Sequence, residues 1–384
     1  MKVYPKTAVR YFLDDRVVYR NLEPADPNLP GLKELSKEVG VQPGKIPRKV
    51  EPEYARAMVH LLKIAQGQRG CSEPIRRLIY VGDTHLLDGT AYGNICQAGD
   101  WEGLAFIGSE NNQPISIQTV LHPNCKPLYL ANRWAALPEF ARYASTHNMP
   151  VDESTAVIID LDKTALGARG RNDRVIDQAR INAVQNTMAI LLGEAFDLED
   201  FLRSYRLLNQ PEFHPFTADN QDYLAYVCLM LGSQLFRLDQ VVEDVRAGRL
   251  KSFHQFIEIV NEKRNGLSPE LAEIHSEIYA HTQAGDPTPF KLFRRNEYLC
   301  TIERFGNLAD NAPLELYLEQ EILITQEVRG TAQIWSEQGA LLFGLSDKPD
   351  EAAIPTPELA KQGYQPIHRA MTHAVGEVIQ EYKE

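Results

Sequence analysis

Four short apolar runs, each ending abruptly in a small or acidic residue, constrain the fold of this chain most strongly. They are 78–81 (before Gly-Asp), 104–107 (before Gly-Ser), 156–159 (before Asp) and 340–345 (before Ser-Asp). Uninterrupted runs of this length are typical of central strands in a parallel sheet, which are buried on both faces. Ligands of open parallel sheets bind at the carboxyl ends of the strands. The residues that end these runs are therefore the candidates for a functional site.

Between the third and fourth runs, the apolar residues recur with helical spacing instead. Helices are expected at 174–192, 198–208, 223–236, 238–247, 252–265, 270–281 and 314–328, with no strand-like run between them, and a further helix is expected at 52–66. The C-terminal tail around His368 and His373 is also expected to be helical. We therefore predict an α/β protein with a Rossmann-like parallel sheet core, formed by 1–168 and 331–384. A large all-helical cap, 169–330, is inserted into this core.

Charge and cysteine content narrow the class of protein. Lys and Arg total 40 and Asp and Glu total 52, so the formal net charge is −12. Such a surface repels nucleic acids and anionic membranes, and neither is expected as a partner. The five cysteines are odd in number and include no CxxC pair, which argues against a zinc ribbon or a disulfide scaffold. Because no signal peptide or bilayer-spanning run is recognisable, a cytoplasmic location is expected.

Carboxylates follow two of the four apolar runs. Asp160 and Asp162 come just after 156–159, at a spacing that lets both face one site where the chain leaves the sheet. Asp83 follows Gly82 at the end of 78–81, and Asp88 comes five residues later. Carboxylates at strand ends can bind a divalent cation, attack an electrophile or transfer protons. Each motif taken alone fits a solvated acidic turn equally well.

These strand ends resemble the motifs of the haloacid dehalogenase (HAD) superfamily of phosphohydrolases. The first motif of that family, DxDx(T/V), is matched by Asp160, Asp162 and Thr164. The second motif is an apolar strand ending in Ser or Thr, and Ser346 matches it. The residues that follow, Asp347-Lys348-Pro349, look like the (S/T)NKP variant of phosphoglycolate-phosphatase-like members.

The two remaining motifs of the family occur earlier in the chain than expected. The fourth motif, an apolar strand followed by GDxxx(x)D, is matched by Gly82, Asp83 and Asp88. The third, a Lys ahead of the helix that leads into that strand, is matched by Lys49. The motifs therefore run third, fourth, first, second, and the chain resembles a circularly permuted member. Such a rewiring is physically tolerable because the termini of a domain often lie close together.

The resemblance implies a Mg²⁺-dependent phosphatase that hydrolyses a small phosphate monoester through an aspartyl-phosphate. It implies that Asp160 is the nucleophile and that Asp162 is the general acid and base. The family's magnesium would be held by Asp160, by the backbone carbonyl of Asp162 and by Asp83. Asp88 would serve as a further ligand or as an outer partner. Lys49 and Ser346 would hold the phosphoryl oxygens.

Further residues in or after the first motif are candidates for substrate binding: Lys163, Thr164, Arg169 and Arg171. Lys163 stands where many members of the family have Gly. Lys45 and Lys348 are alternatives to Lys49 as the phosphate-binding lysine. An unpermuted chain with Lys348 in this role would need a GDxxxD segment after it, and none follows. This favours Lys49.

Two other classes of function fit parts of the sequence. In a metal-dependent glycosyltransferase, a DxD after a strand holds a metal and a diphosphate, but this leaves Gly82-Asp83 and Lys49 unexplained. A catalytically weak HAD relative could act as an interaction module, but loss of Asp160 or Asp162 would then be expected, and both are present. The phosphatase interpretation leaves open whether water or another molecule accepts the phosphoryl group.

Overall fold

The computed structural model describes residues 1–42, 44–121, 127–146 and 149–377. Cys125 lies outside these residues, and no disulfide bond joins the four described cysteines, Cys71, Cys96, Cys228 and Cys300. No described helix is both long enough and apolar enough to cross a lipid bilayer.

The chain forms two compact units. Met1–Gln178 and Thr301–Glu384 make up the first unit, and Ala179–Cys300 makes up the second. The second unit is therefore shorter at both ends than the predicted cap, 169–330.

Residues 301–330 belong to the first unit because they contribute a strand to it. This strand, β8 (Ile324–Thr325), pairs in parallel with β10 (Thr372–Gly376). The single helix predicted at 314–328 is therefore wrong, since α14 (Leu314–Gln320) ends before β8 and α15 (Gln326–Glu337) begins after it. A strand of two residues is too short to give a recognisable alternation in the sequence.

The first unit is built on a seven-stranded sheet in the order β2-β9-β7-β3-β4-β6-β5. Its strands are β2 (Val17–Val18), β3 (Arg77–Gly82), β4 (Glu102–Gly108), β5 (Ile117–Leu121), β6 (Pro127–Ala131), β7 (Thr155–Asp160) and β9 (Leu341–Leu345). All neighbouring pairs are parallel except β5 with β6. The four apolar runs form β3, β4, β7 and β9, which are adjacent in the sheet and almost completely buried. The prediction of central parallel strands is thus confirmed.

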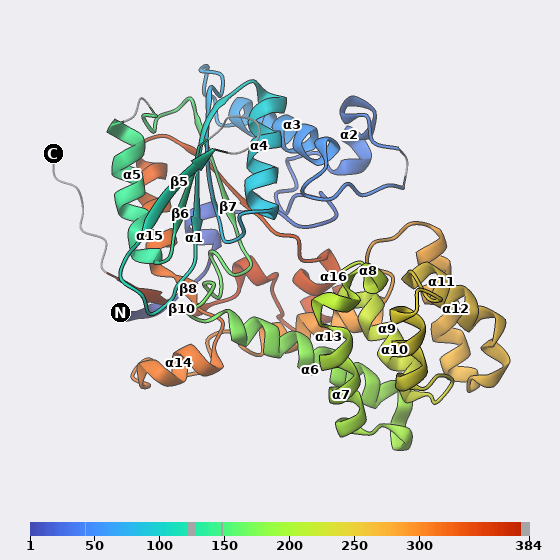
Figure 1. Ribbon diagram of the computed structural model, residues 1–384. Coiled ribbons are helices and arrows are strands. Elements are labelled where there is room, and N and C mark those ends of the chain that lie inside the picture. The colour runs from blue at the N-terminus through green and yellow to red at the C-terminus, as the bar shows by residue number, and fades with distance from the viewer. Residues whose placement is uncertain (43, 122–126, 147–148, 378–384) are drawn as a thin grey trace. The chain divides into compact units, whose positions relative to one another are not determined.

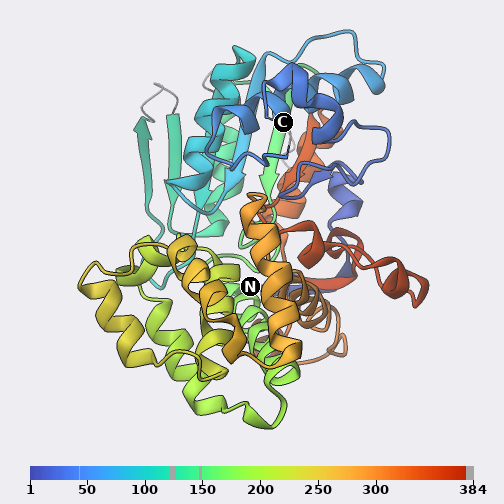
Figure 2. The same cartoon turned by 90° about the vertical axis from the view of Figure 1, so that its right-hand side faces the viewer.

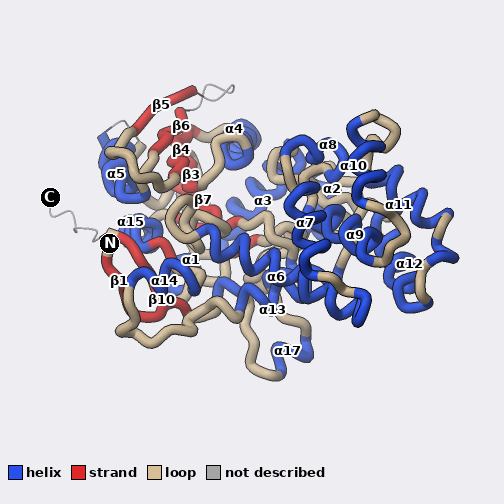
Figure 3. The backbone as a smooth tube through the Cα atoms, turned by 60° about the horizontal axis from the view of Figure 1, so that its bottom comes forward, coloured by secondary structure: helices blue, strands red, loops and turns tan. Residues whose placement is uncertain are grey.

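Helices cover both faces of this sheet (Figures 1 and 3), which explains why its central strands are apolar on both sides. On one face lie α2 (Leu32–Val39), α3 (Pro52–Gln68) and α4 (Leu87–Gly99). On the other lie α1 (Arg10–Leu13), α5 (Leu137–Thr146) and α15. The helix predicted at 52–66 is confirmed as α3, whose Met58, Leu61 and Leu62 pack into the core beneath the sheet.

A second, three-stranded sheet in the order β1-β10-β8 joins early and late parts of the chain. In this sheet β1 (Lys2–Thr7) runs antiparallel to β10. The short helices α16 (Asp350–Ala353) and α17 (Pro357–Lys361) precede β10. The prediction of a helical tail is wrong, because His373 lies in β10 and His368 lies in a single 3₁₀ turn. Both imidazoles are fully buried, and each forms a hydrogen bond with a carboxylate.

The second unit contains helices and no strand (Figure 2). Its helices are α6 (Asp173–Leu192, which begins in the first unit), α7 (Leu198–Leu208), α8 (His214–Thr217), α9 (Gln221–Gly232), α10 (Leu238–Arg246), α11 (Phe253–Glu262), α12 (Pro269–Gln283) and α13 (Lys291–Ile302). The helices predicted between 174 and 281 are confirmed within a few residues at each end. A buried ion pair between Arg294 and Asp222 joins α13 to α9 inside this unit.

The side chain of Asn172 connects the segment before α6 to residues 301–330 by hydrogen bonds. Its buried side-chain amide donates to the carbonyls of Leu318 (2.8 Å) and Glu321 (3.0 Å). Its side-chain oxygen accepts from the backbone N–H of Leu323 at 3.0 Å. Asn172→Ala removes the hydrogen-bond partner of three backbone groups, those of the buried Glu321 and Leu323 and of the half-buried Leu318. We therefore expect a loss of about 3 kcal/mol in the free energy of unfolding.

Urea denaturation measures this loss. The matched control is Asn28→Ala, because Asn28 is exposed and its side chain bonds only to Asp26 nearby. That variant is expected to stay within about 0.5 kcal/mol of wild type. Equal stability of the two variants would contradict the role given to Asn172.

Candidate active site

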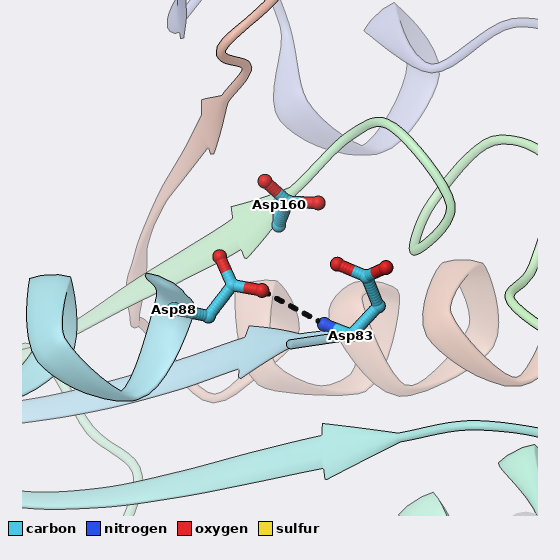
Figure 4. A group of neighbouring side chains, drawn as sticks. All are labelled: Asp83, Asp88 and Asp160. Atoms are coloured by element: carbon cyan, nitrogen blue, oxygen red, sulfur yellow. Dashed lines mark hydrogen bonds between the residues drawn. The ribbon is translucent and has the colours of Figure 1, made fainter. Parts of the chain in front are cut away.

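The carboxyl ends of β7 and β3 bring Asp160 and Asp83 to the same edge of the sheet. The two strands pair in parallel, with Ile159 opposite Val81, so the residues that follow each strand come side by side. Asp88 joins them from the first turn of α4. One carboxylate oxygen of each residue lies within 4.8 Å of the others. Figure 4 shows the three carboxylates turned toward a common space.

Asp88 anchors the turn between β3 and α4. Its Oδ2 accepts hydrogen bonds from the backbone N–H of Asp83 (3.0 Å), the backbone N–H of Thr84 (2.8 Å) and the Thr84 hydroxyl (2.7 Å). Its Oδ1 accepts from Lys49 Nζ at 2.6 Å and from the Tyr80 hydroxyl at 3.1 Å. Both oxygens are fully used, so Asp88 is better suited to hold its neighbours than to coordinate a metal.

Gly82 is required for this close approach of Asp88. A Cβ atom at position 82 would lie 2.6 Å from the carboxyl carbon of Asp88. Any side chain at this position would push the carboxylate away from the turn that it anchors. The glycine of the GDxxxxD pattern therefore has a steric reason.

Lys49 is buried between two of the carboxylates. Its Nζ donates to Oδ1 of Asp160 at 2.6 Å and to Oδ1 of Asp88 at 2.6 Å. Among the described residues, Lys49 is the only side chain that hydrogen-bonds the Asp160 carboxylate, so Oδ2 of Asp160 is left without a donor. Lys45 is half exposed and pairs with Glu51 instead, at 3.3 Å. The expected closeness of Lys49 to Asp160 is confirmed, while its chemical role stays a prediction.

The site holds more negative than positive charge. Burial favours the neutral form of Asp88, but Lys49 and Thr84 outweigh it and hold the pKa of Asp88 at about 2. Burial, together with the charge of Asp88, raises the pKa of Asp83 to about 7 against the opposing effect of Arg169. Burial also raises the pKa of Asp160, and Asp88 and Asp83 add to it despite Lys49. Three carboxylates thus share two cations, an imbalance that a divalent ion with oxygen ligands would correct.

The first motif continues into a tight turn after β7. The Asp162 side chain is half-buried and makes no hydrogen bond or ion pair with any residue that the structure describes. Lys163 has a φ of 64°, in the left-handed region that Gly adopts most easily, and its Nζ pairs with Asp177 at 2.8 Å. Thr164 is fully buried, and its carbonyl accepts from the Thr325 hydroxyl. The structure therefore does not expose Thr164, a predicted substrate-binding residue, to a ligand.

The two candidate arginines lie in different surroundings. The Nε of Arg169 donates to Oδ2 of Asp83 at 2.5 Å, which brings its guanidinium to the carboxylate cluster. Arg171 is buried and pairs with Glu327 at 2.9 Å and Glu110 at 2.8 Å. Arg171 also donates to the carbonyl of Val375 in β10, so it joins the two sheets of the first unit. The donors on its two terminal nitrogens are occupied by the protein itself, and its buried Nε has no partner among the described residues.

Ser346 directly follows β9, whose neighbour β7 ends at Asp160. In the parallel pairing of β7 with β9, Asp160 lies opposite Leu345, the residue before Ser346. The backbone N–H of Ser346 donates to the carbonyl of Val18 at 3.0 Å. Its hydroxyl oxygen accepts from the backbone N–H of Lys348 at 3.0 Å. The backbone donor is thus occupied, and only the hydroxyl proton of Ser346 is left to hold an anionic oxygen.

Two residues of the site were not predicted as such, Tyr80 and Thr84. Both donate to Asp88, Tyr80 from within β3 and Thr84 from the turn after it. Tyr80 was part of an apolar run, where a phenol hydroxyl in the last residues of the strand was the available signal. Thr84 lies between Asp83 and Asp88 in the motif itself, where a small hydroxyl residue can bond the acidic side chain.

Comparisons with known proteins found no match: no protein-family model, no curated protein and no solved structure matches this chain. The resemblance to the HAD superfamily therefore depends on the motifs and on the geometry described above.

Exchanging the two nearby lysines for methionine tests which of them the site depends on. Lys49→Met leaves Asp88 and Asp160 buried without their cation, so we expect a loss of about 3 kcal/mol in the free energy of unfolding at pH 8. Lys45→Met removes only an exposed pair, with an expected loss under about 0.5 kcal/mol. Urea denaturation of both variants measures the difference. A Lys45 variant as unstable as the Lys49 variant would contradict this assignment.

The raised pKa of Asp83 predicts how stability depends on pH. The folded-state pKa, about 7, lies above the usual carboxyl value, so the folded protein binds the proton more tightly than the unfolded chain. The resulting stabilisation is complete below pH 4 and is lost as the pH rises through 7. Asp83→Asn removes this dependence, so in EDTA it should gain about 2 kcal/mol over wild type between pH 5 and pH 8. A difference between the two proteins that stays constant over this range would refute the prediction.

Proposed function

We propose that this protein is a Mg²⁺-dependent phosphatase of small phosphate monoesters and a circularly permuted member of the HAD superfamily. One observation carries the proposal. Lys49, Asp83 and Asp160 are far apart in the chain, yet Lys49 Nζ lies 2.6 Å from Asp160, and the carboxylates of Asp160 and Asp83 belong to one cluster. These residues match the third, fourth and first motifs, and their convergence is what a permuted member of the family requires.

The residues of the cluster fit a magnesium ion. The donor set consists of carboxylate oxygens, which Mg²⁺ prefers over nitrogen and sulfur ligands. Asp160 and Asp83 would hold the ion, with the backbone carbonyl of Asp162, while Asp88 keeps its five protein donors. When bound, the ion neutralises part of the charge that would otherwise repel a phosphate dianion from the carboxylates.

The protein's own side chains carry out the remaining steps of the reaction. Lys49 holds Oδ1 of Asp160, so Oδ2 is the oxygen that attacks phosphorus and forms the aspartyl-phosphate. As the bond from phosphorus to the substrate oxygen breaks, Asp162 gives its proton to that oxygen. Asp162 then takes a proton from water, whose oxygen attacks phosphorus and releases Asp160 and inorganic phosphate. The unpaired, half-buried carboxyl of Asp162 suits this exchange.

The surroundings of the site reduce the candidates for substrate binding. Lys163 and Arg171 form ion pairs with carboxylates that are not part of the cluster, and Thr164 is buried. Arg169 and the hydroxyl of Ser346 remain, together with Lys49, as donors for the phosphoryl oxygens. We assign this role to them because donors aimed at developing charge stabilise the transition state of phosphoryl transfer.

Phosphate release from a panel of phosphate monoesters, with Mg²⁺ and with EDTA, tests the function. We expect turnover that depends on Mg²⁺ and falls by about 10³-fold or more in Asp160→Asn, which lacks the nucleophile. Asp162→Asn should lose about 10²- to 10⁴-fold on alkyl phosphates and less on p-nitrophenyl phosphate, whose leaving group needs no acid. Asp14→Asn, an equal charge change at an exposed residue, should keep wild-type activity.

The outcomes separate the competing functions. Mg²⁺ binding without phosphate release would favour transfer of the phosphoryl group to an acceptor other than water. Neither Mg²⁺ binding nor turnover would favour the interaction-module alternative and sink the proposal.

A further inference from the structure

Arg169 lies on the solvent side of the carboxylate cluster. Its Nε is 2.5 Å from Oδ2 of Asp83, and the exposed fractions of the two side chains are 37% and 6%. Asp83 is the single ion-pair partner of Arg169 among the described residues. The guanidinium thus covers a nearly buried carboxylate while keeping contact with water.

The backbone of Arg169 is held on both sides. Its N–H donates to the carbonyl of Lys163 at 2.7 Å, and its carbonyl accepts from the N–H of Glu110 (2.9 Å) and the indole of Trp134 (3.2 Å). The next residue, Gly170, has a φ of 76°, and a Cβ there would lie 2.0 Å from the carbonyl oxygen of Glu110. The backbone of this loop is therefore held against Glu110, and the side chain is the part of Arg169 that can move.

Two other cations, Lys49 of the cluster and the candidate Arg171, cannot move in this way. Lys49 is buried with its ammonium between two carboxylates. The Arg171 side chain is 3% exposed and pairs with two glutamates. Leaving either place would strand buried charges, which costs several kcal/mol. Arg169 would strand one carboxylate, and that carboxylate is the one expected to bind a divalent cation.

We propose that Arg169 and the divalent cation exclude each other at Asp83, and that cation binding releases the guanidinium to bind the phosphoryl group of the substrate. This inference rests on the proposed function of the same site. An arginine in contact with Oδ2 occupies the space and the lone pairs that a metal ligand must offer. Because Asp83 and Asp160 oxygens lie within 4.8 Å of each other, a guanidinium released from Asp83 stays within reach of a phosphoryl group at Asp160.

The exchange keeps the charge of the site balanced in both states. Without the cation, Arg169 compensates Asp83, and with the cation, the guanidinium is free to offer paired N–H donors to phosphate oxygens. Metal and phosphate then bind cooperatively, and the coupling must be reciprocal. Arg169 thus makes each of the two ligands bind more tightly when the other is present.

Titration calorimetry on the full-length protein tests the exchange, with MgCl₂ as the first titrant and inorganic phosphate as the second. Arg169→Gln removes the competitor, so it should bind Mg²⁺ more tightly than wild type, on the order of tenfold. In saturating Mg²⁺ the same variant should bind phosphate about tenfold more weakly. Arg169→Lys keeps the charge but loses the planar guanidinium. Its affinities for Mg²⁺ and for phosphate should lie between those of wild type and of Arg169→Gln.

Arg76→Gln is the matched control, because Arg76 is exposed and precedes β3 at the opposite end of that strand. It makes the same charge change and should bind Mg²⁺ within about twofold of wild type. If Arg169→Gln and Arg169→Lys bind Mg²⁺ no more tightly than Arg76→Gln, the exchange is overturned, while phosphate release by wild type would leave the proposed function intact. A wild-type protein that binds no Mg²⁺ would overturn both.

Discussion

The ammonium of Lys49, buried between Asp88 and Asp160, is the interaction on which the rest of the site depends. It joins the segment before α3, the first turn of α4 and the end of β7 at one point. Buried charges are tolerated only where the pairing geometry is good and the remaining lone pairs are satisfied. Asp88 meets this requirement with its five donors, and it thereby fixes the turn after β3. The positions of Asp83 and Asp160 relative to each other follow from this turn and from the pairing of β3 with β7.

The same arrangement leaves one carboxylate without a buried cation. Lys49 compensates Asp88 and Asp160, and Asp83 has only the half-exposed Arg169. A site that concentrates like charges in this way is less stable than an apolar one, and proteins keep such sites where function requires them. Binding of a divalent ion to the folded state would recover stability by mass action. Asp83 is therefore the carboxylate of the cluster whose charge is least compensated by a buried cation.

The sequence predicted the parts of the fold that are governed by burial on both faces or by regular helical spacing. β3, β4, β7 and β9 were predicted because helices cover both sides of them, and the helices of the second unit because their apolar positions recur. β8 was missed because it has only two residues, and β10 because its buried polar residues, Thr372 and His373, interrupt the apolar pattern. Asp160 and Asp83 were found because parallel strands bring the residues at their carboxyl ends to one edge, and Lys49 because it matches the third motif of the HAD superfamily. Tyr80 could not be separated from its apolar run, since only the fold shows that its hydroxyl reaches Asp88.

The order of the motifs along the chain matters less to the site than the order of the strands in the sheet. β9, β7 and β3 are neighbours, so Ser346, Asp160 and Asp83 meet at one edge whichever strand comes first in the sequence. A circular permutation changes only the connections, and it requires that the segments to be joined in the unpermuted order lie near each other. β1 and β10 meet this requirement, since Lys2 lies opposite Gly376 in an antiparallel pair. The pairing of these two strands is therefore compatible with the proposed permutation.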